Sequence, residues 1–268
     1  MSIIKTRGLV HDFIRRDEED NVESITTALD HVDLDVKEGQ FIAILGHNGS
    51  GKSTQIANLQ RMFAERGIST EYLHFPRFDA PFFGELIARF LRGELGSVEQ
   101  VDPYIVAMLY AGDRRDAAAM IRGWMDEGKV VICDRYVYSN IGYQCAKVAD
   151  AAEREKLREW ILSLEYDYFA IPRPDVSLFL DVPFAFTERK LLQDVREGDD
   201  RAYLNGKKDI HEQSMALQRA VRQVYLDAAE CDENMHVVDC SAGGEMASPE
   251  AIFEKIMSVV DNYINTKH

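Results

Sequence analysis

From residue 41 onward, short apolar runs alternate with longer segments in which apolar residues recur every three or four positions. The short runs cover residues 41–45, 71–75, 130–133, 176–180 and 235–238. Most of them are continuously apolar, which is typical of strands that are buried on both faces of a parallel sheet. The sequence therefore predicts a strand at each of these runs.

The longer segments predict helices, and residues that start or stop a helix stand at their ends. Helices are expected at residues 52–66, 82–92, 102–126 and from 248 to near the C-terminus. Asp102 and Pro103 supply an N-cap and a first-turn proline, and Gly67 follows a helix as its C-cap. Alternating strands and helices predict an α/β fold with a doubly wound parallel sheet flanked by helices. Ligands of such folds bind beyond the carboxyl ends of the strands.

The first 38 residues follow another pattern. Val32, Leu34 and Val36 alternate with aspartates, which is typical of a half-buried antiparallel strand. Residues 3–10 are its expected partner, and the charged stretch 15–21 is expected to be a solvated loop. We therefore predict a small N-terminal antiparallel β appendage at 1–38 and a second domain at 39–268.

Composition excludes several partners. The 268 residues are 46% hydrophobic and 29% charged, as in ordinary globular proteins. The net charge of −15 argues against a nucleic-acid partner, because nonspecific binding needs a basic face. No apolar run reaches the roughly 18 residues of a membrane span. The four cysteines lack Cys-x-x-Cys spacing and fit free thiols in a reducing cytosol, so we expect a cytoplasmic protein.

A phosphate-binding loop follows the first apolar run. The pattern Gly-x-x-x-x-Gly-Lys-Ser/Thr is met by Gly46, His47, Asn48, Gly49, Ser50, Gly51, Lys52, Ser53 and Thr54. A strand, a glycine loop and a helix let backbone N–H groups surround the phosphates of ATP or GTP. We expect Lys52 to reach the β- and γ-phosphates and the Ser53 hydroxyl to reach Mg²⁺. A glycine-rich turn without a ligand is the alternative.

Further polar residues follow other strands at the same edge of the sheet. After the 130–133 strand, Asp134 is a candidate Mg²⁺ ligand and Arg135 a candidate phosphate ligand, although a plain surface turn would also fit. Pro76 stiffens the turn after the 71–75 strand and directs Arg77 toward the site.

Two helices carry side chains suited to an aromatic base with polar edges. Asn140, Tyr143 and Gln144 share one helical face, and Tyr110 and Arg114 stand four residues apart on the preceding helix. Core aromatics with surface arginines are the alternative. The segment 195–201 is charged and interrupted by a glycine. We expect it to be part of a mobile lid, at about 195–209, that brings an arginine to the transferring phosphate. A plain solvated loop is the alternative.

As an ordered set, these motifs resemble thymidylate kinases, from about Gly46 to the C-terminus. The matching text is Phe75-Pro76-Arg77, Leu109-Tyr110-Ala111-Gly112-Asp113-Arg114, the segment from Asp134 to Gln144, and the lid. The resemblance implies ATP-dependent phosphorylation of dTMP to dTDP with Mg²⁺, in a protein that forms homodimers.

The resemblance also implies roles for individual residues. Arg77 and Arg135 would hold the dTMP phosphate, and Phe75 and Gln144 belong to the motifs that line the dTMP site. Tyr110 would stack on thymine, Arg114 and Asn140 would hydrogen-bond its edge, and Tyr143 would exclude a ribose 2′-OH. Ser50 is not basic, and in that subtype the lid supplies the catalytic arginine, here Arg196 or Arg201. Cys240 and Ser241 stand where the family contacts adenine.

Two positions depart from the family pattern. Thymidylate kinases usually carry an acid at the position of Asn48, where it binds the sugar 3′-OH, and a Glu at the position of Leu45. The Asn48 amide still hydrogen-bonds a hydroxyl but carries no charge, which weakens the contact by roughly 1–2 kcal/mol.

Residues 1 to about 54 resemble a different family, the N-terminus of transporter ATPases of the ABC energy-coupling-factor or cobalt type. The matching text runs from Ala28 to Gln40 and then into the phosphate-binding loop. This predicts a fusion of two sequences at the shared Gly-Lys-Ser-Thr.

Three other functions are alternatives to a thymidylate kinase. A transport ATPase needs a Leu-Ser-Gly-Gly-Gln-type signature before an apolar strand that ends in Asp-Glu, and the nearest string, Ser241 to Glu245, has no such strand after it. A kinase for another nucleotide or a deoxynucleoside, and a nucleotide-binding remnant inactivated by the fusion, stay open.

Overall fold

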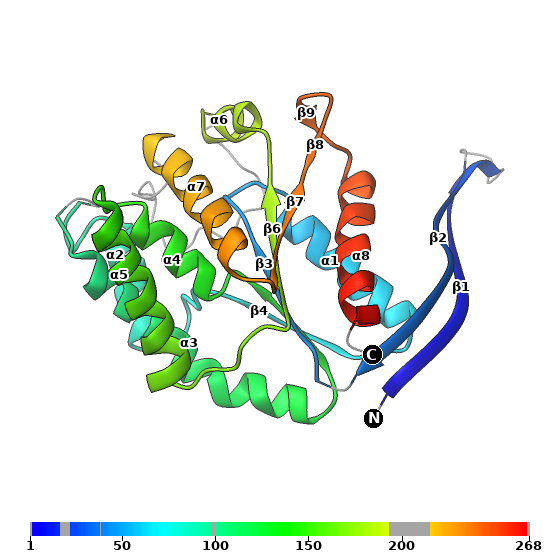
Figure 1. Ribbon diagram of the computed structural model, residues 1–268, viewed down its shortest axis with the longest axis horizontal. Helices are drawn as coiled ribbons and strands as arrows, with labels where there is room; N and C mark the ends of the chain where they lie inside the picture. Colours follow the sequence, from blue (N-terminus) through cyan, green and yellow to red (C-terminus); the bar gives the residue numbers. More distant parts are fainter. Residues whose placement is uncertain (1, 17–21, 38, 98–99, 193–214, 267–268) are drawn as a thin grey trace.

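The computed structural model describes residues 2–16, 22–37, 39–97, 100–192 and 215–266. Within these ranges, a five-stranded sheet occupies the centre, in the order β4-β5-β3-β6-β7 (Figure 1). Its strands are β3 (Phe41–Leu45), β4 (Thr70–His74), β5 (Val130–Asp134), β6 (Val176–Asp181) and β7 (Met235–Asp239). All neighbouring strands run parallel. The predicted parallel sheet is confirmed, and each boundary differs from the prediction by at most one residue.

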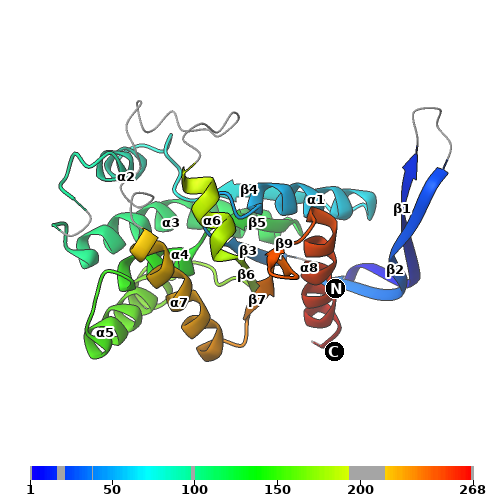
Figure 2. The ribbon, with the colours of Figure 1, turned by 90° about the horizontal axis from the view of Figure 1, so that it is seen from above.

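Helices cover both faces of this sheet, as Figures 1 and 2 show. On one face, α1 (Lys52–Glu65) and α8 (Pro249–Thr266) bury Ile42, Ile44 and Leu178. On the other face, α3 (Pro103–Asp126), α4 (Val137–Cys145), α5 (Ala151–Leu162) and α7 (Met215–Cys231) bury Phe41, Ala43 and Phe179. Successive residues of one strand thus enter opposite cores, which is why the predicted strands are apolar throughout.

Shorter elements complete the described chain. They are α2 (Phe83–Leu91), α6 (Phe184–Leu192), a π-helical segment η1 (Ser163–Tyr168) and the small hairpin β8 (Ser241–Ala242) with β9 (Glu245–Met246). The predicted N-cap is confirmed, because the Asp102 side chain accepts a hydrogen bond from the Tyr104 N–H at 2.8 Å. No helix in these ranges combines the length and the apolar character of a membrane span.

The N-terminal residues form a separate two-stranded antiparallel sheet from β1 (Ser2–Arg16) and β2 (Val22–Lys37). The predicted pairing is confirmed, but the strands are longer than predicted. Arg15 and Arg16 were expected in a loop, yet they pair with Ser24 and Val22, because charged side chains do not interrupt a main-chain ladder. Residues 17–21 lie outside the described ranges. Figure 2 shows the hairpin beside α8, extending away from the five-stranded sheet.

Candidate active site

The phosphate-binding loop lies at the carboxyl end of β3, between β5 and β6, where the strand order of the sheet reverses. Open parallel sheets bind ligands at this point. A side chain at Gly46 would be strained, because its φ of 150° is rare for other residues and a Cβ there would lie 2.6 Å from the Ser50 hydroxyl oxygen. The Lys52 ammonium group donates hydrogen bonds to the carbonyl oxygens of Gly46, at 3.2 Å, and His47, at 3.0 Å. The loop thus folds around its lysine next to the first turn of α1.

Asp134 ends β5 beside this lysine. Its carboxylate oxygen Oδ1 lies 3.9 Å from the Lys52 nitrogen. That oxygen is buried and accepts no hydrogen bond from the described residues. Ser53 stands exposed in the first turn of α1. A carboxylate with an unused oxygen and a hydroxyl are oxygen ligands that suit Mg²⁺ together with ATP phosphates.

Arg135 lies directly against the phosphate-binding loop. Its backbone is left-handed, with a φ of 66°. Its guanidinium Nη2 donates a hydrogen bond to the Asn48 side-chain oxygen at 2.5 Å. The guanidinium carbon lies 5.6 Å from the centre of the Tyr143 ring on α4. The structure therefore brings three predicted site residues together from three separate elements.

Arg114 and Asn140 meet at a carboxylate that the sequence analysis missed. Glu165 in η1 accepts hydrogen bonds from Arg114 Nε at 2.5 Å and Nη2 at 2.7 Å. Asn140 Nδ2 donates to the same carboxylate at 3.0 Å. A signal was present: Leu157, Ile161 and Glu165 recur at i, i+4 and i+8, so the acid occupies an apolar position of a helical face.

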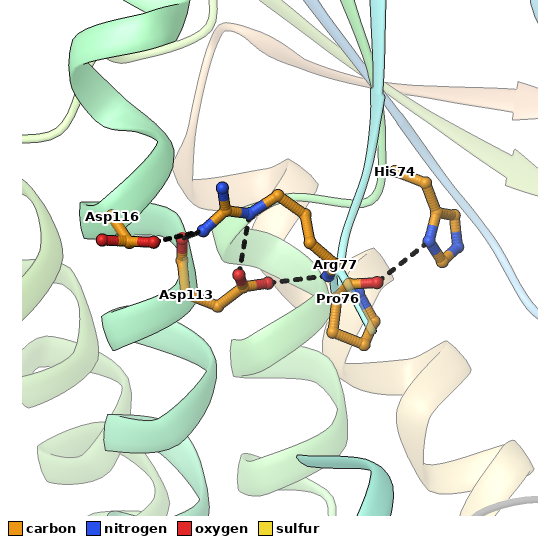
Figure 3. Close-up of polar contacts among 5 residues, drawn as sticks. All are labelled: His74, Pro76, Arg77, Asp113 and Asp116. Atoms are coloured by element: carbon orange, nitrogen blue, oxygen red, sulfur yellow. Dashed lines mark hydrogen bonds and ion pairs between the residues drawn. The ribbon is translucent and has the colours of Figure 1, made fainter. Parts of the chain in front are cut away.

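The Arg77 guanidinium is held by α3 rather than by the phosphate-binding loop (Figure 3). Its Nε donates to Asp113 Oδ1 at 2.8 Å and its Nη2 to Asp116 Oδ2 at 3.0 Å. The Asp113 carboxylate also accepts from the Arg77 backbone N–H at 2.9 Å. Nη1 makes no hydrogen bond to the described residues.

The other residues of the predicted dTMP site come from three places: Phe75 follows β4, Tyr110 lies in α3 and Gln144 lies in α4. Phe75 is buried, with its ring centre 6.0 Å from the Arg114 guanidinium carbon. Tyr110 is partly buried and packs against an apolar cluster that includes Phe90. Gln144 is buried, and its side-chain oxygen accepts from Lys147 at 2.7 Å.

The predicted adenine contacts lie near the loop as well. Met246 in β9 lies beside the loop, since its methyl carbon would be 4.0 Å from a Cβ placed on Gly51. Met246 pairs with Ser241, the first residue of β8. Cys240 is buried, and the Ser241 hydroxyl donates to Asp239 at 2.7 Å. The predicted lid, with Arg196 and Arg201, lies outside the described residues.

His47 ties the phosphate-binding loop to α7. Its Nδ1 donates to the Gln218 side-chain oxygen at 2.7 Å, whereas its buried Nε2 has no hydrogen-bond partner among the described residues. Burial, with the nearby charges of Arg135 and Lys52, lowers the pKa of His47 from 6.5 to about 4. The folded protein therefore carries this histidine neutral at pH 5, where the unfolded chain binds a proton.

This difference predicts a pH-dependent stability. The contribution of neutral His47 to the free energy of unfolding is fully present above pH 6.5. It is lost as the pH falls toward 4, since the unfolded state binds more protons in that window. Replacing His47 with Asn keeps a donor for Gln218 but removes the titration. Between pH 7.5 and 5, wild-type unfolding free energy should fall by about 2 kcal/mol more than that of His47→Asn. Urea unfolding at the two pH values measures this, and equal losses would contradict it.

Comparisons with known proteins point to one family. The family model described as thymidylate kinase matches residues 44–250. A probable thymidylate kinase of Pyrococcus abyssi is 32% identical over 224 residues, covering 83% of this chain and 96% of the relative. A thymidylate kinase of Mycobacterium tuberculosis is 31% identical over 189 residues, with 70% and 85% covered. A solved thymidylate kinase structure from Candida albicans, 22% identical, superimposes with a TM-score of 0.62 over 84% of this chain and 92% of that one.

Proposed function

Because the chain belongs to the thymidylate kinase family, we propose that it transfers the γ-phosphoryl group of ATP to the phosphate of dTMP. The contact between Arg135 and Asn48 carries this proposal. It joins the arginine predicted to hold the acceptor phosphate to the loop predicted to hold the donor phosphates. An acceptor phosphate bound by Arg135 would therefore lie beside the γ-phosphate of ATP.

An in-line transfer would use residues on the donor side and the acceptor side of the site. An oxygen of the acceptor phosphate attacks the γ-phosphorus, and the bond from that phosphorus to the β,γ-bridging oxygen breaks. No general base is needed, since the acceptor is already an anion. Lys52 and a lid arginine, Arg196 or Arg201, would neutralise the charge on the equatorial oxygens.

Mg²⁺ belongs to this proposal because Asp134 and Ser53 offer suitable oxygen ligands. When bound, the ion would neutralise phosphate charge and orient the β- and γ-phosphates. Asp134 would balance the Lys52 charge until the nucleotide arrives. Arg77 Nη1 would donate to the acceptor phosphate, while Asp113 and Asp116 hold the rest of that side chain.

A coupled assay of ADP release tests the function. Reactions with dTMP, dUMP, dCMP and no acceptor separate a thymidylate kinase from kinases of other nucleotides and from a plain ATPase. We expect dTMP to give the highest kcat/KM. ADP release that is unchanged by any acceptor would refute the proposal.

Asn48 provides a prediction specific to this chain. Replacing it with Asp restores the acid usual in the family, so a carboxylate faces both Arg135 and the proposed position of the 3′-OH. We expect kcat/KM for dTMP to rise about tenfold, as charged hydrogen bonds exceed neutral ones by roughly 1–2 kcal/mol. Steady-state kinetics with dTMP and with 3′-deoxy-dTMP measure the effect. An equal gain with both acceptors would contradict the 3′-OH contact.

We also propose a homodimer in the cytosol, as the resemblance and the free cysteines imply. Ile105 and Met108, neighbours on one face of α3, are 51% and 43% exposed and offer apolar surface for a second copy. Sedimentation velocity distinguishes a dimer from a monomer.

For the N-terminus, we propose that residues 1–54 derive from a transporter-type ATPase and join the kinase sequence at the phosphate-binding loop. In this proposal, residues 1–38 are an appendage and residues 39–268 form the kinase domain. The family match begins only at residue 44, and β1 and β2 pair with each other rather than with the central sheet. Sequencing the source DNA across codons 45–60 checks the junction.

A further inference from the structure

Glu165 is a fully buried carboxylate that holds two residues of the proposed acceptor site at once. Arg114, from α3, occupies both of its oxygens, and Asn140, from α4, adds a third hydrogen bond. A buried carboxylate is stable only when it is paired and hydrogen-bonded. Here the pairing also fixes the geometry of its partners.

The contacts determine which way the Asn140 amide points. Nδ2 donates to the Ala107 carbonyl oxygen and to Glu165 Oε1, both at 3.0 Å. An ionised carboxylate and a carbonyl oxygen only accept hydrogen bonds, so the NH₂ group must face them. Oδ1 therefore points the other way, and it is buried without a hydrogen-bond partner among the described residues. Asn140 presents a lone acceptor.

A lone acceptor distinguishes between pyrimidine bases. Thymine and uracil carry an N–H donor at N3, whereas cytosine carries an acceptor there. Two facing acceptors leave both buried groups unsatisfied, at a cost of about 1–3 kcal/mol. If the amide were reversed, its NH₂ group would favour cytosine instead.

We propose that Glu165 is the positioning residue that sets base selection, because it locks the Asn140 amide with its oxygen toward the base. This inference rests on the proposed dTMP kinase function, in which Asn140 contacts the base edge. Among the described residues, the Glu165 carboxylate accepts hydrogen bonds from the side chains of Arg114 and Asn140, so it acts through them.

Replacing Glu165 with Gln tests the inference. The glutamine amide can turn its NH₂ group toward Asn140 and so stabilise the reversed orientation. We expect the ratio of kcat/KM for dTMP to kcat/KM for dCMP to fall at least tenfold. The Ala107 carbonyl oxygen still favours the original orientation, so some discrimination should persist. A merely structural role for Glu165 would lower both kcat/KM values together, and an unchanged ratio in folded E165Q would overturn the proposal.

A second variant decides the question if E165Q does not fold. Glu165→Asp keeps the negative charge opposite Arg114, but it is one methylene shorter and cannot reach both partners. We expect a fall in the same ratio of threefold or more, and an unchanged ratio in this variant would also overturn the proposal. Glu155→Gln is the matched control, because Glu155 pairs with Arg158 on the exposed face of α5, and its ratio should equal the wild-type value.

The same assays separate the two levels of the proposal. Wild-type protein that fails to release ADP with dTMP would refute the kinase function itself. Wild-type protein that prefers dTMP, with variants that retain the same preference, would refute only the role of Glu165.

Discussion

Replacing Lys52 with Met should lower kcat for dTMP-dependent ADP release by about 1,000-fold, the loss seen when a preorganised charge-stabilising donor is removed. The Lys52 side chain is 7% exposed, and two loop carbonyls fix its ammonium group. In the proposed transfer, its charge would therefore meet the developing charge of the transferring phosphate with little reorganisation. Removing it also leaves the buried Asp134 carboxylate without its neighbouring cation.

This result needs a control for folding and for lost surface charge. Lys156→Met removes an exposed lysine that pairs with Glu153 on α5, and its kcat should stay within about twofold of wild type, as is usual for surface positions. Coupled kinetics at saturating ATP and thermal unfolding of each variant provide the measurements. A Lys52→Met protein that is folded and retains a tenth of wild-type activity would remove Lys52 from the mechanism.

Replacing Arg135 with Met should lower kcat/KM for dTMP by about 1,000-fold and leave the Kd of ATP within about threefold of wild type. Charge-assisted hydrogen bonds to phosphate are among the strongest in proteins, and each tenfold change corresponds to about 1.4 kcal/mol. The Tyr143 ring and the Asn48 amide hold this guanidinium in place, so little entropy is lost when it binds the acceptor. Met keeps the side-chain volume without the charge.

Two measurements divide the effect between substrates. Initial rates give kcat/KM for dTMP, and calorimetric titration gives the Kd of a nonhydrolysable ATP analogue. Arg61→Met is the matched control, since Arg61 donates to Asn58 at 3.1 Å in a comparable arginine–asparagine pair on the exposed face of α1. Equal losses of dTMP turnover and ATP affinity in Arg135→Met would place this arginine on the donor side instead.

The elements of the fold were predictable because they depend on local signals. Each central strand is apolar and short, and Asp102 and Pro103 mark the start of α3 by their own chemistry. At Arg15 and Arg16 the prediction of a loop was wrong, because cross-strand pairing with β2 outweighs the local charge of the segment. Strand ends also placed Asp134 and Arg135 correctly at the edge of the sheet that carries the phosphate-binding loop.

The contacts of the candidate site were less predictable. Arg77 follows its strand as expected, but the acids of α3 that hold it come from a segment 36 residues away. Glu165 stands in a π-helical segment, and only the packing of α3, α4 and η1 brings it to Arg114 and Asn140. Periodicity assigns residues to a buried face without stating which residue lies opposite.

By itself, the sequence determined the five central strands, the helices α1, α2, α3 and α8, the phosphate-binding loop and the set of polar residues at one edge of the sheet, because each depends on neighbouring residues. Only the tertiary structure decided that Arg135 donates a hydrogen bond to Asn48 and that Arg77 donates one to Asp113. It also decided that the Asn140 NH₂ group faces the Ala107 carbonyl oxygen, so that the amide oxygen points the other way. These pairings join residues 33 to 87 positions apart. The distances between the paired side chains are set by how the helices pack on the sheet, and no local sequence pattern encodes that packing.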